Sequence, residues 1–185
     1  MNKIAVFFPG IGYTNDRPLL YYSAYTLKRK GYHLIKLDFT GFPDGVFNDE
    51  KKMMKCFELA LNQAGDELKS VSFNNADDIL FVSKSLGTSV AAFYASKHNL
   101  PVRHIFFTPL ENTLSLVKPG SAGIAFSGTN DPWADYEKIR TACDRRKIHI
   151  TLVKDANHSL ETGEFTADIG ILSEIMHSID GFTGL

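Results

Sequence analysis

The residues around Ser85 have the types and spacing of a nucleophilic serine. Ser83 and Gly87 are small residues two positions before and two positions after it, between an apolar run and a helical pattern. A sharp turn from strand to helix strains the backbone of its central residue and leaves room only for small neighbours. Such a turn would lift the Ser85 hydroxyl above the strand end, beside a helix N-terminus that favours developing negative charge. The pattern alone is a weak indication, because serine-rich turns of this kind also occur without a catalytic role.

A serine hydroxyl is scarcely ionised at neutral pH, so this chemistry needs a nearby general base. The chain has six histidines. Five of them stand at the starts of predicted strands or late in predicted helices: His33, His98, His104, His149 and His177. Only His158 follows the carboxyl end of a predicted strand. A lone loop histidine is more often a plain surface residue, but this position favours catalysis, and we predict His158 as the base.

The base in turn needs a carboxylate that fixes its tautomer and stabilises the imidazolium. Asp131 lies in the turn-rich loop after the apolar run Gly123–Phe126, and it is the preferred candidate. An aspartate before a proline also commonly supports a turn or caps a helix, so that alternative stays open. Asp135 and Asp155 are rivals. Asp135 is placed to cap the next helix, and Asp155 is so close to His158 in sequence that the chain would have to fold back sharply.

Acyl chemistry also needs backbone amides that stabilise an oxyanion. We expect the first donor to be the amide of Leu86, directly after the nucleophile, and the second to be that of Ile11, with Gly12 as the alternative. Gly10 and Gly12 would let the loop after the first strand approach a substrate oxygen closely. The same loop could belong to a dinucleotide or phosphate site, but Asn15 stands where the third glycine of that motif would be.

These side chains need a scaffold that brings several strand ends together, and the hydrophobic pattern predicts one. The predicted strands are Ile4–Phe8, Leu34–Phe39, Ile79–Val82, Ile105–Phe107, Gly123–Phe126 and Ile148–Val153. The predicted helices are Arg17–Lys30, Asp49–Lys69, Leu86–His98, Trp133–Arg145 and Thr166–Ile179. Most strands are continuous apolar runs that alternate with helices, which predicts a parallel sheet with helices on both faces, an α/β fold of three layers.

Smaller signals refine this outline. Asp16 is expected to cap the first helix, and Gly31 is expected to end it. Only the segment Thr108–Ser121 has no clear pattern. The length of 185 residues suits a single α/β domain over residues 1–185.

Composition limits the functional classes. The net charge of −1 provides no strong field to attract nucleic acid or an anionic membrane. Cys56 and Cys143 are far apart in sequence and are expected to be reduced, buried thiols, so neither a metal site nor a cofactor is indicated. We find no signal peptide and no apolar stretch approaching the roughly 18 residues of a membrane span. The expected protein is cytoplasmic, and its expected partner is a small-molecule substrate.

Four motifs together resemble those of the α/β-hydrolase superfamily, specifically its small bacterial members without a lid, over nearly the whole chain. Residues 9–12 are similar to its HGxG loop with proline in place of histidine, residues 83–88 resemble its nucleophile elbow, residues 128–133 its acid loop and residues 157–161 its histidine loop. The resemblance implies about six parallel strands in the order 2-1-3-4-5-6, a minimal form of the fold that lacks the family's first two strands and the cap.

The resemblance also implies a serine hydrolase of the carboxylesterase type, which cleaves an ester or thioester through a Ser85–His158–Asp131 triad and an acyl-enzyme. Without a cap, short loops would bind the substrate, with Gly10, Tyr13, Leu86, Leu110 and Trp133 as candidate walls. Lys84 is expected at the surface or rim of the site. Three alternatives remain: an acyltransferase or thioesterase that uses the same triad, a non-catalytic binding or scaffold protein on this fold, and a flavodoxin-like nucleotide binder.

Overall fold

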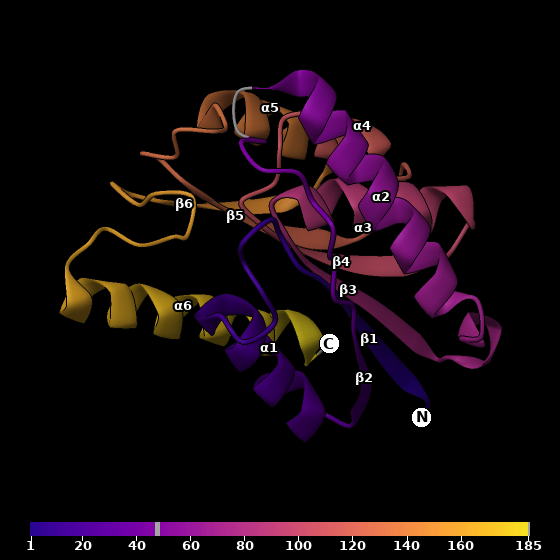
Figure 1. Ribbon diagram of the computed structural model, residues 1–185. Coiled ribbons are helices and arrows are strands. Elements are labelled where there is room, and N and C mark those ends of the chain that lie inside the picture. Colours follow the sequence, from indigo (N-terminus) through magenta and orange to yellow (C-terminus); the bar gives the residue numbers. More distant parts are fainter. Residues whose placement is uncertain (47–48, 185) are drawn as a thin grey trace.

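The computed structural model describes residues 1–46 and 49–184 and arranges them around one parallel sheet (Figure 1). The strand order is β2-β1-β3-β4-β5-β6, which confirms the α/β fold and the order implied by the resemblance. The strands are β1 (Lys3–Phe8), β2 (Tyr32–Lys36), β3 (Asp78–Lys84), β4 (Val102–Phe107), β5 (Gly123–Gly128) and β6 (His149–Val153). The helices are α1 (Pro18–Arg29), α2 (Glu50–Leu68), α3 (Leu86–Lys97), α4 (Thr113–Leu116), α5 (Tyr136–Arg146) and α6 (Phe165–Thr183), with a 3₁₀ turn at Phe73–Asn75.

Helices cover both faces of the sheet, so the molecule has three layers. Figure 1 shows α1 and α6 on one face and α2, α3, α4 and α5 on the other. Strand β1 is apolar on both sides: Val6 and Phe8 join the cluster that includes α2 and α3, and Ala5 and Phe7 join the cluster that includes α1 and α6. Successive residues of a strand face opposite sides, so a strand covered on both faces is a continuous apolar run.

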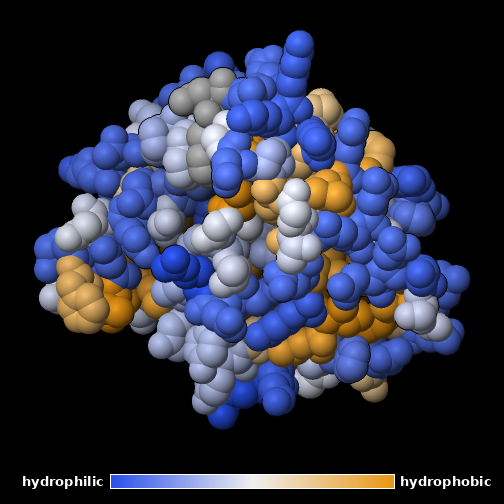
Figure 2. Space-filling model, viewed as in Figure 1, coloured by the Kyte–Doolittle hydropathy of each residue, from blue (hydrophilic) through white to orange (hydrophobic). Residues whose placement is uncertain are grey.

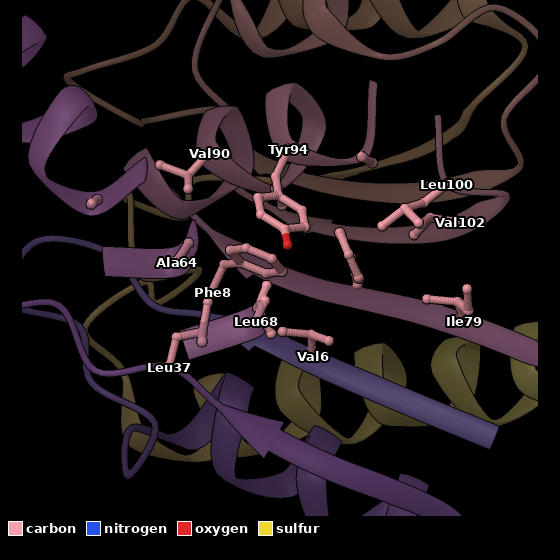
Figure 3. Packing of buried hydrophobic residues seen from close by; sticks show 14 of the residues in the cluster. Val6, Phe8, Leu37, Ala64, Leu68, Ile79, Val90, Tyr94, Leu100 and Val102 are labelled. Atoms are coloured by element: carbon pink, nitrogen blue, oxygen red, sulfur yellow. The ribbon is translucent and has the colours of Figure 1, made fainter. Parts of the chain in front are cut away.

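The hydrophobic cluster against α2 and α3 holds α3 and β1 together near Ser85. In Figure 3, Tyr94 points from α3 towards Phe8 of β1, and Leu68 of α2 lies beside them. Phe8 is fully buried, and burial of such a side chain contributes about 1.5–3 kcal/mol. This packing fixes α3, which begins directly after Ser85, against β1, which leads into the glycine loop at residues 9–13.

Several predicted boundaries were wrong. Asp16 does not cap the first helix, because the helix begins at Pro18 with Arg17 in the cap position. The Leu19 amide donates instead to the Tyr13 hydroxyl, at 3.1 Å. Gly31 does follow the helix end, with φ of +83°. Strand β2 covers Tyr32–Lys36, earlier than the expected Leu34–Phe39.

Two further differences lie near the candidate site. Helix α5 begins at Tyr136 instead of Trp133, because the Asp135 carboxylate accepts hydrogen bonds from the amides of Glu137 and Lys138 and so sets the first turn. The segment without a clear sequence pattern contains the short helix α4. No larger insertion stands between β4 and β5 in this described part of the chain.

Across residues 1–46 and 49–184, no helix combines the length and apolar character needed to cross a bilayer. The same residues contain no group of three or more His, Cys, Asp or Glu side chains arranged as metal ligands. Cys56 and Cys143 are buried free thiols, as expected, and burial raises the pKa of Cys143 to about 12. The cytoplasmic location stays a prediction.

His104 in β4 is a buried histidine that must stay neutral in the folded chain. Its ring stacks on Phe106 with centroids 4.8 Å apart, and its Nδ1 has no hydrogen-bond partner among the described residues. Burial lowers the pKa of His104 from 6.5 to about 3. Below about pH 6.5, the unfolded chain therefore binds a proton at this histidine and the folded chain does not, so acid removes stability.

We expect His104→Phe to weaken this acid sensitivity. Between pH 7.5 and pH 5, the free energy of unfolding should fall by about 2 kcal/mol more in the wild type than in the variant, as measured by urea denaturation. His33→Gln, at an exposed position of β2, is the control and should follow the wild type. Equal losses in His104→Phe and the wild type would contradict the assignment.

Candidate active site

The structure brings Ser85, His158 and Asp131 into one hydrogen-bonded row. Ser85 Oγ lies 2.8 Å from His158 Nε2, and His158 Nδ1 lies 2.6 Å from Asp131 Oδ2. With a proton on Nδ1, the imidazole donates to the carboxylate and accepts from the serine hydroxyl. The three residues follow β3, β6 and β5 respectively, so each comes from the carboxyl end of a different strand.

A strained turn presents Ser85. Its φ of 53° and ψ of −122° are a backbone conformation that L residues rarely adopt. The turn also needs Gly87, because a Cβ atom there would lie 2.2 Å from the Phe8 carbonyl oxygen and 2.4 Å from that of Pro9. Ser83 is fully buried and donates a hydrogen bond to the Ile105 carbonyl, which shows that the preceding position also sits in a crowded environment.

The acid loop and the histidine loop meet through a second close backbone contact. A Cβ atom on Gly128 would lie 2.2 Å from the Ala156 carbonyl oxygen and 2.6 Å from that of Asn157. The amide of Asn130 donates to the Ala156 carbonyl at 2.9 Å. The loops that carry Asp131 and His158 are therefore held together by their main chains, and the two side chains meet as a consequence.

Short local hydrogen bonds shape each of these loops. The Asn157 side-chain oxygen accepts from the amides of Ser159 and Glu161, which curls the chain around His158. Asp131 Oδ1 accepts from the amide of Trp133 at 2.9 Å, so the carboxylate is fixed at both oxygens. The expected turn-supporting role of Asp131 and its contact with His158 thus occur together.

Burial makes the imidazole a weaker base. The His158 side chain is 9% exposed and that of Asp131 is fully buried. Burial is the main cause that lowers the pKa of His158, and the positive charge of Lys84 acts in the same direction. The hydrogen bond and the charge of Asp131 act in the opposite direction but do not outweigh burial.

The glycine loop after β1 passes directly beside the serine. A Cβ atom on Gly10 would lie 3.1 Å from Ser85 Cβ, so this loop lies against the elbow. The Gly10 amide donates a hydrogen bond to the Tyr13 carbonyl at 3.1 Å. Within the described chain, the amides of Ile11, Gly12 and Leu86 donate to no protein acceptor. Their role as oxyanion donors stays a prediction.

The candidate walls differ in their accessibility. Trp133 is 47% exposed, and its ring packs edge-on against His158 with centroids 4.7 Å apart. Leu110 is half-buried in the loop after β4. Tyr13 is buried, with its hydroxyl accepting from Leu19, so it supports the loop more than it offers a surface.

Tyr13 also lines a pocket of about 210 Å³ that the histidine loop borders. Apolar side chains of α1, α6 and this loop form most of it: Leu19, Leu160, Phe165, Ile169, Ile171, Leu172 and Ile175. Figure 2 shows the apolar surface over the first turns of α6, where Phe165 is 78% exposed and Ile169 is 52% exposed. Neither Ser85 nor His158 lines this pocket.

The rival residues lie elsewhere. Asp135 caps α5, and the Asp155 side chain is 77% exposed beside Lys154. Among the other histidines, His104 is buried in β4, and the remaining four are exposed: His33, His98, His149 and His177. Asp131 and His158 are the pair that the fold brings to Ser85.

The prediction for Lys84 was wrong. We expected it at the surface or rim, but it is 1% exposed, with its Nζ donating to Thr108 Oγ1 at 2.6 Å and lying 5.0 Å from the centroid of the Tyr13 ring. The physical reason is the position of β3 between β1 and β4 in the sheet. A side chain at the end of this central strand has loops on both sides, and they enclose it.

Sequence reasoning placed Gly128 in the acid loop and Thr108 at the border of the site, but it did not predict the contacts that they make. The acid-loop motif includes Gly128 but gives no reason for a glycine at this position. Its contact with the histidine loop arises because β5 and β6 are neighbours in the sheet. Thr108 has a φ of +42°, which is unusual for a β-branched residue, and no local sequence signal predicts it.

No protein-family model and no curated protein matches the sequence. Solved structures do match the fold. An α/β serine hydrolase homologue from Coxiella burnetii has a TM-score of 0.62 and 16% identity, with 97% of this chain and 83% of that chain covered. An α/β serine hydrolase without a lid from Xanthomonas campestris has a TM-score of 0.62 and 13% identity, covering 97% and 81%. An esterase from Pyrococcus furiosus has a TM-score of 0.63 and 15% identity, covering 95% and 81%.

These likenesses show that the chain has the α/β-hydrolase fold, as its motifs indicated. At such low identity they concern the fold alone. The sheet order and the short connection between β4 and β5 agree with a form of this fold that has no lid.

We expect Gly128→Ala to separate the acid and histidine loops, because the added Cβ would overlap the Ala156 carbonyl. Overpacking of this kind costs about 1–3 kcal/mol, so the melting temperature should fall by roughly 3–10 °C in a calorimetric scan. Gly170→Ala in α6 is the matched control. Its Cβ would meet nothing within 4 Å, and the helix should gain about 0.5–1 kcal/mol. The close contact is disproved if both variants melt at or above the wild-type temperature.

Proposed function

We propose that this chain is a serine hydrolase that cleaves an ester or thioester of a small acyl substrate through an acyl-enzyme on Ser85. One observation carries the proposal: the hydrogen-bonded row from Asp131 through His158 to Ser85, with distances of 2.6 Å and 2.8 Å. The α/β-hydrolase fold and the esterase among the matching structures support it. A fold hosts many reactions, so the row of side chains carries more weight than the likeness.

In the first half of the reaction, Ser85 Oγ attacks the acyl carbonyl carbon while His158 Nε2 takes the hydroxyl proton. The carbonyl π electrons move to oxygen, and the amides of Leu86 and Ile11 donate to the resulting oxyanion, with Gly12 as the alternative donor. Asp131 holds the proton of the imidazole on Nδ1 and stabilises the imidazolium that forms.

The second half regenerates the serine. His158 gives its proton to the leaving alcohol or thiol as the tetrahedral intermediate collapses to the acyl-enzyme. Water then attacks the acyl carbon, the imidazole takes a proton from that water, and the second tetrahedral intermediate releases the carboxylic acid as Ser85 recovers its proton.

The site favours substrates that approach an open edge of the sheet. Trp133 is half-exposed and packs on His158, so the leaving group or the acyl chain would lie against its indole ring. Leu110 would contribute a second apolar wall from the loop after β4. Transfer of the acyl group to another alcohol instead of water would use the same groups, and a panel of matched esters and thioesters with an added alcohol would separate these outcomes.

Labelling with a fluorophosphonate probe tests the nucleophile. The wild type should be labelled at Ser85, located by mass spectrometry, and Ser85→Ala should lose both labelling and hydrolysis of a short p-nitrophenyl ester, by about 10⁴-fold or more. Ser121→Ala, near the opposite edge of the sheet, is the control and should retain both. A folded wild-type protein that resists the probe would instead support a non-catalytic binding role.

Substitution of the acid tests the row of hydrogen bonds. Asp131→Asn should reduce kcat by about 10⁴-fold, because the amide favours the wrong imidazole tautomer. Asp135→Asn is the matched control, since asparagine caps a helix as well as aspartate does, and its kcat should stay near that of the wild type. Similar kcat values for the two variants would remove Asp131 from the mechanism.

A further inference from the structure

Lys84 is a buried charged group that the proposed reaction does not use. It directly precedes Ser85, its side chain is enclosed, and its Nζ contacts side chains from two other loops. One is the Thr108 hydroxyl from the loop after β4, at 2.6 Å, and the other is the face of the Tyr13 ring from the loop after β1, at 5.0 Å from its centroid. The amine thus connects the loops after β1 and β4 with the elbow after β3 that carries Ser85.

No carboxylate among the described residues forms an ion pair with this amine within 4.0 Å. The charges that act on it from farther away are those of Asp131, after β5, and Glu161, in the histidine loop, and both favour the ammonium form. Ser85, the next residue in the chain, places its Oγ 2.8 Å from His158 Nε2, so the buried lysine directly precedes the residue that contacts the imidazole. The lysine charge acts to lower the pKa of His158.

The remaining neighbours are neutral side chains. Ser85 is adjacent in the chain, Thr108 accepts the hydrogen bond, and burial raises the pKa of the Tyr13 hydroxyl to about 12, so that this ring stays uncharged. Arg17 and Glu161 act on Tyr13 with opposite signs. The side chains that contact the cation are therefore uncharged, and no ion pair within 4.0 Å among the described residues neutralises it.

We propose that Lys84 is a positioning residue of this site: its ammonium group, held by Thr108 and Tyr13, keeps His158 unprotonated in mild acid and so keeps the general base available. The inference rests on the proposed function of Ser85 for its kinetic part only. The effect of the Lys84 charge on the pKa of His158 does not depend on catalytic turnover.

Lys84 affects His158 only at a pH where the lysine is charged. Burial lowers the pKa of Lys84 from 10.5 to about 7, while the pKa of His158 lies below its usual 6.5. In mild acid, well below its pKa, Lys84 is a cation. Its charge then disfavours a second cation on the imidazole, so protonation of His158 is delayed to lower pH.

Removal of the charge should reverse this effect. Lys84→Met and Lys84→Gln are both neutral at every pH, and only glutamine retains a hydrogen-bonding group for Thr108. We expect the pKa of His158 to rise by about one unit in both variants. A change caused only by loss of the hydrogen bond to Thr108 would instead occur in Lys84→Met and not in Lys84→Gln.

The titration of His158 can be followed directly by ¹H–¹³C NMR of the imidazole Cε1–H, with the resonance assigned by its loss in His158→Gln. The matched control is Lys154→Met, which removes a lysine charge at a position that is 90% exposed and follows β6. Water and salt screen such a charge, so the pKa of His158 should stay at its wild-type value.

The rate of fluorophosphonate labelling against pH provides the kinetic readout without a known substrate. The acidic limb should move upward by about one pH unit in Lys84→Met and Lys84→Gln, so that well below this limb labelling is about tenfold slower than in the wild type. Lys154→Met should retain the wild-type limb.

The results separate the two proposals. An unchanged His158 pKa in both Lys84 variants overturns the inference even if Ser85 is labelled. A raised pKa in both variants supports the electrostatic coupling, and absence of labelling in the wild type would then count against the proposed reaction only. If Lys84→Met does not fold, the comparison of Lys84→Gln with Lys154→Met decides the question alone.

Discussion

The candidate site depends on two places where backbones approach each other more closely than any side chain allows. Gly87 lets the elbow after β3 lie against the end of β1, and Gly128 lets the end of β5 lie against the loop after β6. Each contact joins a pair of strand ends. Together they bring Ser85, Asp131 and His158 into register, although these residues are separated by dozens of positions in the chain. Packing of the core positions the strands, but these two contacts set the distances between the loops.

Much of this arrangement could be predicted from the sequence, because it follows from periodicity and order. Apolar runs that alternate with helical patterns predict a parallel sheet, and the carboxyl ends of parallel strands share one edge. This logic selected His158 among six histidines, and the structure places it beside Ser85. The choice between Asp131, Asp135 and Asp155 needed more, because all three lie in loops. The structure separates them through hydrogen bonds to amides and to the imidazole.

The errors share a physical cause: contacts between segments that are neighbours only in space. Asp16 was a reasonable cap by type, but the Tyr13 hydroxyl takes the Leu19 amide instead. Lys84 looked like a surface residue by type, yet the loops after β1 and β4 enclose it. His104 is a corresponding case in the middle of β4, a polar side chain packed between aromatic rings in a central strand. Residue type predicts exposure poorly where a strand has neighbours on both sides and both faces.

The fluorescence of Trp133 can report the protonation state of His158. It is the single tryptophan of the chain, it is half-exposed, and its indole ring touches the imidazole of His158. Tryptophan fluorescence, excited at wavelengths that tyrosine does not absorb, therefore arises from one position. An imidazolium quenches indole emission more strongly than a neutral imidazole does, so the intensity follows the protonation of the histidine. A molecule that settles against the ring would shift the emission wavelength, so the spectrum of the unmodified protein reports both occupancy and charge at this one place.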